Sequence, residues 1–204
     1  MATLAAVSQV GESIVAMLRA RRDLMAQSGQ LGPVPPAVGV SQLALAKLVG
    51  GEAPKAGLTL TCYHIGASDQ PAVRPKVPGQ APRPEIALEL HYLLASWSAK
   101  PEEEQASLAW ALLELSAHQM FDRSLLKGEG MWERDESLQV VATPTSGEQM
   151  AKLWDGTGHK MRLAATLTAR VLRVRRALEA DSEVVVASRF GFSDTDPLEA
   201  EPAL

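Results

Sequence analysis

The sequence predicts an α+β domain in which a twisted mixed or antiparallel sheet of about four strands is flanked by helices. Two long segments, 85–97 and 161–174, alternate in side-chain character with the period of two that strands show. Segments with helical spacing of apolar residues lie before and between them. Because the helix-like and strand-like segments alternate irregularly, this order favours a mixed or antiparallel sheet.

The chain has 204 residues, 46% of them apolar, which is enough for one domain with a hydrophobic core. We assign residues 1–176 to a single α+β domain with long loops at 27–57 and 66–84. Residues 177–204 form an acidic tail with one candidate short strand at 183–190. The domain boundary therefore follows a change in charge, since the tail is net negative and the rest of the chain is net positive.

Cysteine usage and hydropathy indicate the compartment. Cys62 is the single cysteine, which excludes an internal disulfide and fits a reducing environment. The first residues lack the basic segment of a secretion signal, and no apolar run approaches the roughly 20 residues of a membrane helix. We therefore expect the protein to fold in the cytoplasm and to have no membrane partner.

The N-terminal third predicts one long helix, one short helix and one strand. Apolar residues between Val7 and Met25 repeat on one helical face. Ser41 is a candidate cap for a short helix that Gly50 would end. Residues 58–65 are rich enough in β-branched and aromatic side chains for a strand.

A proline-rich loop separates this strand from the longest one. Residues 66–84 contain five prolines and show no apolar period. In the strand 85–97 that follows, the alternation predicts two faces, with Leu90 and Tyr92 on one and Glu89 and His91 on the other. Both faces lean apolar, which predicts a central strand covered on both sides.

Two further helices and two strands follow. Pro101 and the three glutamates after it mark a helix start, and the helix is expected to be heavily buried, Leu113 included. Residues 137–142 predict a short strand. Ser146 and Gln149 form a capping box for a helix that Gly156 closes. The strand 161–174 completes the domain.

The sequence contains no convincing reactive constellation. Glu89 and His91 share a predicted face, but Tyr92 points away from them, so the three residues do not form a catalytic group. Cys62 and His64, two apart on a strand, are expected on one face, yet two ligands do not make a metal site. Residues 155–160 lack P-loop spacing and predict a helix-ending turn. No cofactor, metal or catalytic residue is therefore expected.

Charge is unevenly distributed although the net value is only −4. From Glu179 onward there are seven acidic residues and one arginine, whereas arginines cluster at 19–22 and 170–176. Such clusters attract acidic partners, or are simply solvated ends of helices and strands. No nucleic-acid-binding motif accompanies them, so nucleic acid is not an expected partner.

Several segments in order resemble the cap, or tail-terminator, proteins of extracellular contractile injection systems, phage-tail-like particles of the antifeeding-prophage type. The segments are "LELHYLLASW" (88–97), "EQASLAWALLEL" (104–115) with His118, "SGEQMAKLWDG" (146–156) and "KMRLAATLTARVL" (160–172). In the last strand, Ala164 and Thr166 replace the serine and tyrosine usual in the family.

This resemblance implies a phage tail-terminator-like fold and a structural protein, not an enzyme. It would form a homohexameric ring on the end of the sheath and inner tube and stop their polymerisation. Assembly would take place in the cytoplasm, after which the cap belongs to the assembled, released particle. The candidate interface residues are Arg170, Arg173, Arg175, Arg176, Glu179, Asp181, Arg74 and Lys76.

Two other functions stay open at this point. One is a cytoplasmic assembly adaptor or chaperone that binds disordered acidic segments through the basic end of the last strand. The other is a small hydrolase or transferase that uses His91 or His118.

Overall fold

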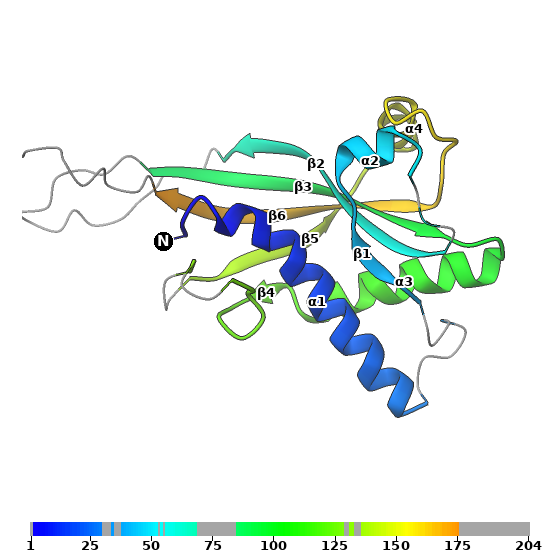
Figure 1. Cartoon of the computed structure of the whole chain (residues 1–204), viewed down its shortest axis with the longest axis horizontal. Helices are drawn as coiled ribbons and strands as arrows, with labels where there is room; N and C mark the ends of the chain where they lie inside the picture. Colours follow the sequence, from blue (N-terminus) through cyan, green and yellow to red (C-terminus); the bar gives the residue numbers. More distant parts are fainter. Residues whose placement is uncertain are drawn as a thin grey trace, which may run out of the picture.

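The computed structural model describes residues 2–29, 34, 38–52, 54, 56–68, 85–128, 131–132 and 136–175. In these residues a six-stranded mixed sheet is packed between helices, which confirms the α+β class (Figure 1). The sheet order is β1-β2-β3-β6-β5-β4. Its strands are β1 (Val40–Gln42), β2 (Gly57–Ala67), β3 (Glu85–Trp97), β4 (Met120–Phe121), β5 (Leu138–Thr143) and β6 (Ala164–Arg175). β1 runs parallel to β2, and the other pairs are antiparallel.

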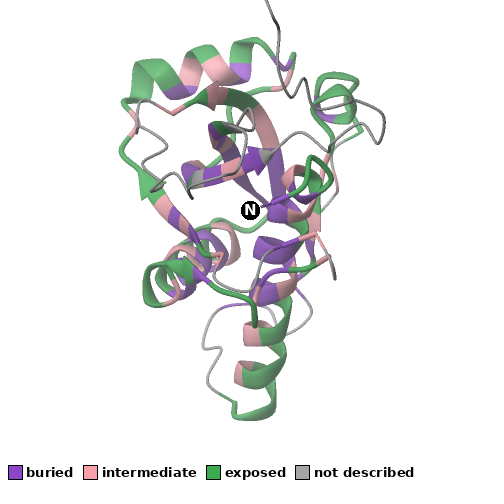
Figure 2. Cartoon of the chain, turned by 90° about the vertical axis from the view of Figure 1, so that its left-hand side faces the viewer, coloured by how far each residue is buried: buried purple, intermediate pink, exposed green. Residues whose placement is uncertain are grey.

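The first face of the sheet is covered by α1 (Ala6–Gln27) and α3 (Pro101–Ala117). The predicted apolar stripe of α1 and the apolar side of α3 pack on alternate residues of every strand, among them Leu60, Leu94 and Val140. This is the main hydrophobic core. In Figure 2 buried residues gather along the strands and on the inward sides of the helices.

The second face carries a smaller core at one end only. α2 (Leu45–Val49) and α4 (Gly147–Asp155) lie there, over the last residues of β3 (Figure 1). Leu93 and Trp97 pack against Leu48, Met150 and Trp154. The predicted capping box of α4 is present, since Ser146 Oγ accepts from the Gln149 N–H at 3.2 Å. The long strand β3 is therefore covered on both sides only along its C-terminal half, whereas the alternation predicted cover on both sides of the whole strand.

Two irregularities interrupt the strand alternation. Tyr63 is an extra residue in β2, because Cys62 pairs with Tyr92 and His64 pairs with His91. In β6 the register shifts by one residue, because Leu88 pairs with Leu172 and Leu90 pairs with Ala169. Ala169 and Leu172 are three residues apart yet both lie in the main core, which requires such a bulge.

Several expectations are corrected. Ser41 does not cap a helix: it lies in β1, and Ala44 precedes α2 with no side-chain cap. The sheet has two short strands, β1 and β4, beyond the four predicted, because two or three residues are too few to show a period. β6 begins at Ala164 rather than residue 161. Leu113 is 66% exposed, since it points away from the sheet.

A further correction concerns Cys62 and His64, which lie on opposite faces. Paired residues of neighbouring strands share a face, so Cys62 is on the Tyr92 side and His64 on the His91 side. The extra residue Tyr63 between them reverses the alternation. The predicted strand 183–190, most of the 66–84 loop and the acidic tail lie outside the described residues. In the described part, no helix is long and apolar enough to cross a membrane.

Candidate assembly interface

The free edge of β2 is the first surface able to meet another chain segment. β1 pairs with β2 only from Leu58 to Leu60, although β2 continues to Ala67. Among the strands that the structure describes, none pairs with the outer side of β2 beyond Leu60. An unpaired strand edge presents a row of backbone donors and acceptors that another strand can bind.

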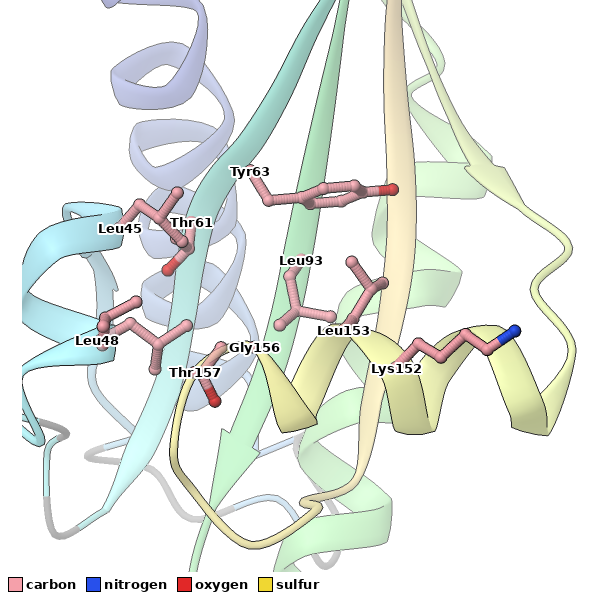
Figure 3. Close-up of a pocket in the computed structure, with 10 residues that line it drawn as sticks. Leu45, Leu48, Thr61, Tyr63, Leu93, Lys152, Leu153, Gly156 and Thr157 are labelled. Atoms are coloured by element: carbon pink, nitrogen blue, oxygen red, sulfur yellow. The ribbon is translucent and has the colours of Figure 1, made fainter.

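A groove lies beside this edge on the second face, between α2 and α4 (Figure 3). It has a volume of about 240 Å³, and four of the residues that line it are leucines, at positions 45, 48, 93 and 153. Thr61 lies on β2 beside Leu45, and Tyr63 lies at the upper end of the view, with burial raising the pKa of the Tyr63 hydroxyl. Such a groove accepts an apolar side chain.

A polar strip runs along the second face, by which we mean His64, His91, Thr143, Thr145, Thr166 and Thr168, of which Thr166 and Thr168 are buried. The hydroxyls of Thr143 and Thr168 hydrogen-bond at 2.6 Å, and Thr168 Oγ1 lies 3.3 Å from His91 Nδ1. The hydroxyls of Thr145 and Thr166 also hydrogen-bond. These groups satisfy one another, as cross-strand hydroxyl pairs do. The strip is therefore a set of mutually hydrogen-bonded groups rather than a reactive site, with His64 and Thr143 as its exposed members.

The Glu89–His91–Tyr92 trio is not assembled. Tyr92 is buried in the main core, where desolvation raises the pKa of its hydroxyl far above the ordinary value. Glu89 is on the opposite side and accepts a hydrogen bond from Ser68 Oγ at 3.0 Å. His118, the other candidate base, follows α3 and contacts the Glu114 carbonyl oxygen at 2.9 Å. No three potential metal ligands converge within the described segments.

The predicted basic residues of β6 fall partly inside the described chain. Arg170 is exposed opposite Gln139, and Arg173 is half-buried opposite Ala87. An odd spacing of three would place them on opposite faces of a regular strand. The β6 bulge instead brings both to the second face, which sequence periodicity cannot reveal. The backbone of Arg175 pairs with Glu85. Arg74, Lys76, Arg176, Glu179 and Asp181 lie outside the described residues and stay predictions.

The other arginine cluster is occupied internally. Arg19 Nε donates to the Val40 carbonyl at 2.7 Å, and Arg22 Nη1 donates to the Val38 carbonyl at 2.7 Å. Arg21 Nε lies 2.7 Å from Glu114 Oε2, which links α1 to α3. These side chains hold the domain together, so only part of the sequence's positive charge is available for a partner.

Comparison with known proteins identifies the architecture. The profile described as the Pvc16 N-terminal domain matches residues 9–188. The structure is similar to an extracellular contractile injection system protein, the PVC sheath/tube terminator in its extended state, with a TM-score of 0.56 and 15% identity. It is also similar to the anti-feeding prophage tube-terminating cap, with a TM-score of 0.53 and 16% identity.

The coverage of these matches is asymmetric. They include 95% and 90% of this chain but only 65% and 60% of the two terminators, so the chain spans less than two thirds of their length. A comparison with curated protein sequences finds no match. The family profile nevertheless matches well over half of the residues. The chain belongs to the Pvc16 N-terminal domain family.

Proposed function

We propose that the chain is a cap, or tail terminator, that ends the polymerisation of the sheath and inner tube of a contractile injection particle. One observation carries the proposal: nearly the whole chain shares the fold of the PVC sheath/tube terminator. The family match to the Pvc16 N-terminal domain supports it independently. Sheath and tube proteins of the same particle are the proposed partners, and assembly takes place in the cytoplasm before the particle is complete.

The physical mechanism is geometric rather than chemical. A head-to-tail contact between identical copies closes into a finite ring when the rotation per copy divides the circle, and we propose six copies. Such a ring covers the growing end of a tube of matching symmetry and presents a different surface outward, so no further subunit adds. Arg170 and Arg173 are the proposed contacts to acidic segments of a neighbour, because both lie on the incompletely covered second face.

A structural role accounts for the site better than hydrolysis does. His91 lies in β3 on the second face and His118 follows α3, which covers the first face. The hydroxyls beside His91 bond to one another. A catalytic base needs a nucleophile or substrate proton within hydrogen-bond reach in an open pocket. The groove between α2 and α4 has an apolar wall and neither histidine lines it.

The test is reconstitution with purified tube and sheath proteins. We expect the protein to form a ring, with a mass close to six chains by light scattering, and to shorten polymers when added during their growth. Electron microscopy should show it at one end of each particle. A protein that stays monomeric and binds neither polymer end would exclude the cap.

The arginine contact is tested by charge reversal. Arg170→Glu with Arg173→Glu should abolish ring formation or end binding while leaving the fold intact, whereas Arg123→Glu, also exposed, should not. Binding of acidic peptides that weakens with salt, without end-specific capping, would favour the adaptor function instead.

A further inference from the structure

We propose that residues 183–190 of this chain add to its own sheet as a strand antiparallel to β2. They would pair along the free edge beyond Leu60, with Phe190 entering the groove between α2 and α4. This inference concerns the isolated chain and does not depend on the cap function.

The outer edge of β2 is paired along only part of its length. β2 is 11 residues long, yet β1 pairs with only three of them, and Ile65 on the remaining part is 51% exposed. Long edges with apolar side chains promote aggregation, so stable proteins cover them. A strand beside Thr61–Ala67 would pair the outward backbone groups and shield Ile65.

The groove supplies a second, independent observation. Thr61 is 1% exposed, and its Oγ1 has no hydrogen-bond partner among the described atoms. Thr61 lines the groove, together with four leucine side chains (Figure 3). A buried hydroxyl without a partner costs about 1–3 kcal/mol, so such groups are usually paired. An entering segment brings both an apolar side chain for the leucines and backbone groups for the Thr61 hydroxyl.

The place where β6 ends favours the segment that follows it as the strand added to β2. β6 ends at Arg175 opposite Glu85, at the same end of the sheet as Ala67 (Figure 1). β6 already has β3 on one side, and on the other side Ala2 bonds to the Arg173 carbonyl at 3.1 Å. The continuing chain therefore has no described place beside β6. At that end, no described strand pairs with the outer side of β2, so this edge is available to it.

Length and direction both fit. From β6 across β3 to the outer side of β2 is three strand spacings of about 4.8 Å each. Residues 176–182 reach on the order of 20 Å when extended, which covers that distance. A chain that leaves β6 and returns along β2 runs opposite to β2, so the added strand is antiparallel. Its later residues then arrive near Thr61 and the groove.

The composition of residues 183–190, "EVVVASRF", matches the role. Three consecutive valines favour a strand, and Phe190 is the largest apolar side chain of the run. The family profile continues to residue 188, past the end of β6, so this segment belongs with the domain pattern. The last acidic residues, from Asp194 onward, lie beyond it.

Amide hydrogen exchange, resolved by residue with NMR, tests the pairing. In the full chain, the outward amides between Thr61 and Ala67 should exchange at least about tenfold more slowly than in a chain truncated after Arg176. Adding a synthetic peptide of residues 179–192 to the truncated chain should restore the protection. Equal exchange in the full and truncated chains would overturn the proposal.

Point variants test the same pairing in the full-length chain, so the result does not depend on the truncated protein remaining folded. Val185→Pro should release the protection because proline lacks the N–H that a ladder needs, whereas Ala200→Pro, outside the segment, should not. Phe190→Ala should likewise speed exchange, with Phe192→Ala as its matched control. Circular dichroism checks that each variant is folded.

Measuring amide protection at several protein concentrations distinguishes a strand supplied by the same chain from one supplied by a second copy. Protection that is unchanged over a hundredfold dilution to monomer supports addition within one chain. Protection that disappears on dilution would overturn it, since a neighbouring copy would then supply the strand. Neither result bears on sheath or tube binding, which the capping assay measures separately.

Discussion

The two faces of the sheet differ in how much of their length is covered. On the first face, α1 and α3 pack over all the long strands and form one continuous core. On the second face, α2 and α4 cover one end, Arg170 and Arg173 lie towards the other, and the polar strip lies between them. The same strands supply both faces, because successive side chains point to opposite sides.

The difference separates stability from interaction. The first face buries apolar area and so provides most of the folding free energy. The half-covered second face leaves the Thr143 hydroxyl, the His64 imidazole and the Arg170 guanidinium exposed, and these contribute little to folding but can bind a partner. Substitutions on the first face should therefore lower the free energy of unfolding more than substitutions on the second face.

The largest effect is expected from Leu94→Ala. Leu94 is 0% exposed in the main core, and its removal leaves a cavity between the sheet and the helices. The free energy of unfolding should fall by about 3–4 kcal/mol, measured by urea denaturation. Leu4→Ala, at an exposed position, is the control and should change stability little. A fall in the free energy of unfolding below about 1 kcal/mol would contradict the conclusion that the first face provides most of the stability.

Met150→Ala tests the smaller core. Met150 packs from α4 onto Leu93 and Trp97 on the second face, so we expect a loss of about 2 kcal/mol. Hydrogen exchange should show that α4 opens more readily while α1 does not. Lys152→Ala, on the exposed side of α4, serves as control. A loss as large as that of Leu94→Ala would mean that the two cores form one cooperative unit.

Arg21→Met measures the ion pair between α1 and α3. Glu114 is mostly buried and would lose its cationic partner, whereas Arg21 itself is 37% exposed, so water screens the pair. We expect a loss of about 1–2 kcal/mol in thermal or urea unfolding. Arg123→Met should be neutral. If both variants behave alike, the pair does not stabilise the helix contact.

The smallest effect is expected in the polar strip. Thr168→Val removes the contacts to Thr143 and His91 but keeps the side-chain shape, and the cost should be about 0.5–1 kcal/mol. A double-mutant cycle with Thr143→Val isolates the coupling between the two hydroxyls. A coupling above about 2 kcal/mol would show that the strip contributes strongly to folding, which would contradict the ranking of substitutions by face.

Local patterns predicted most elements. The period of two located β3 from Glu85 to Trp97, and the capping box located α4, because both signals depend on residues close in sequence. β1 and β4 were missed because they are too short to have a period. Only part of the candidate interface was predicted from the sequence. Arg170 and Arg173 were identified by their charge, whereas the groove and the free edge of β2 were found only in the structure.

The sequence by itself determined which segments are helix or strand and which side chains on a regular strand share a face. Tertiary structure alone decided where that regularity breaks. The bulges at Tyr63 and in β6 separate Cys62 from His64 and bring Arg170 and Arg173 together, and they arise from pairing with β3. The Arg21–Glu114 contact likewise joins residues 93 positions apart. Such features depend on contacts between distant segments, and local periodicity carries no information about them.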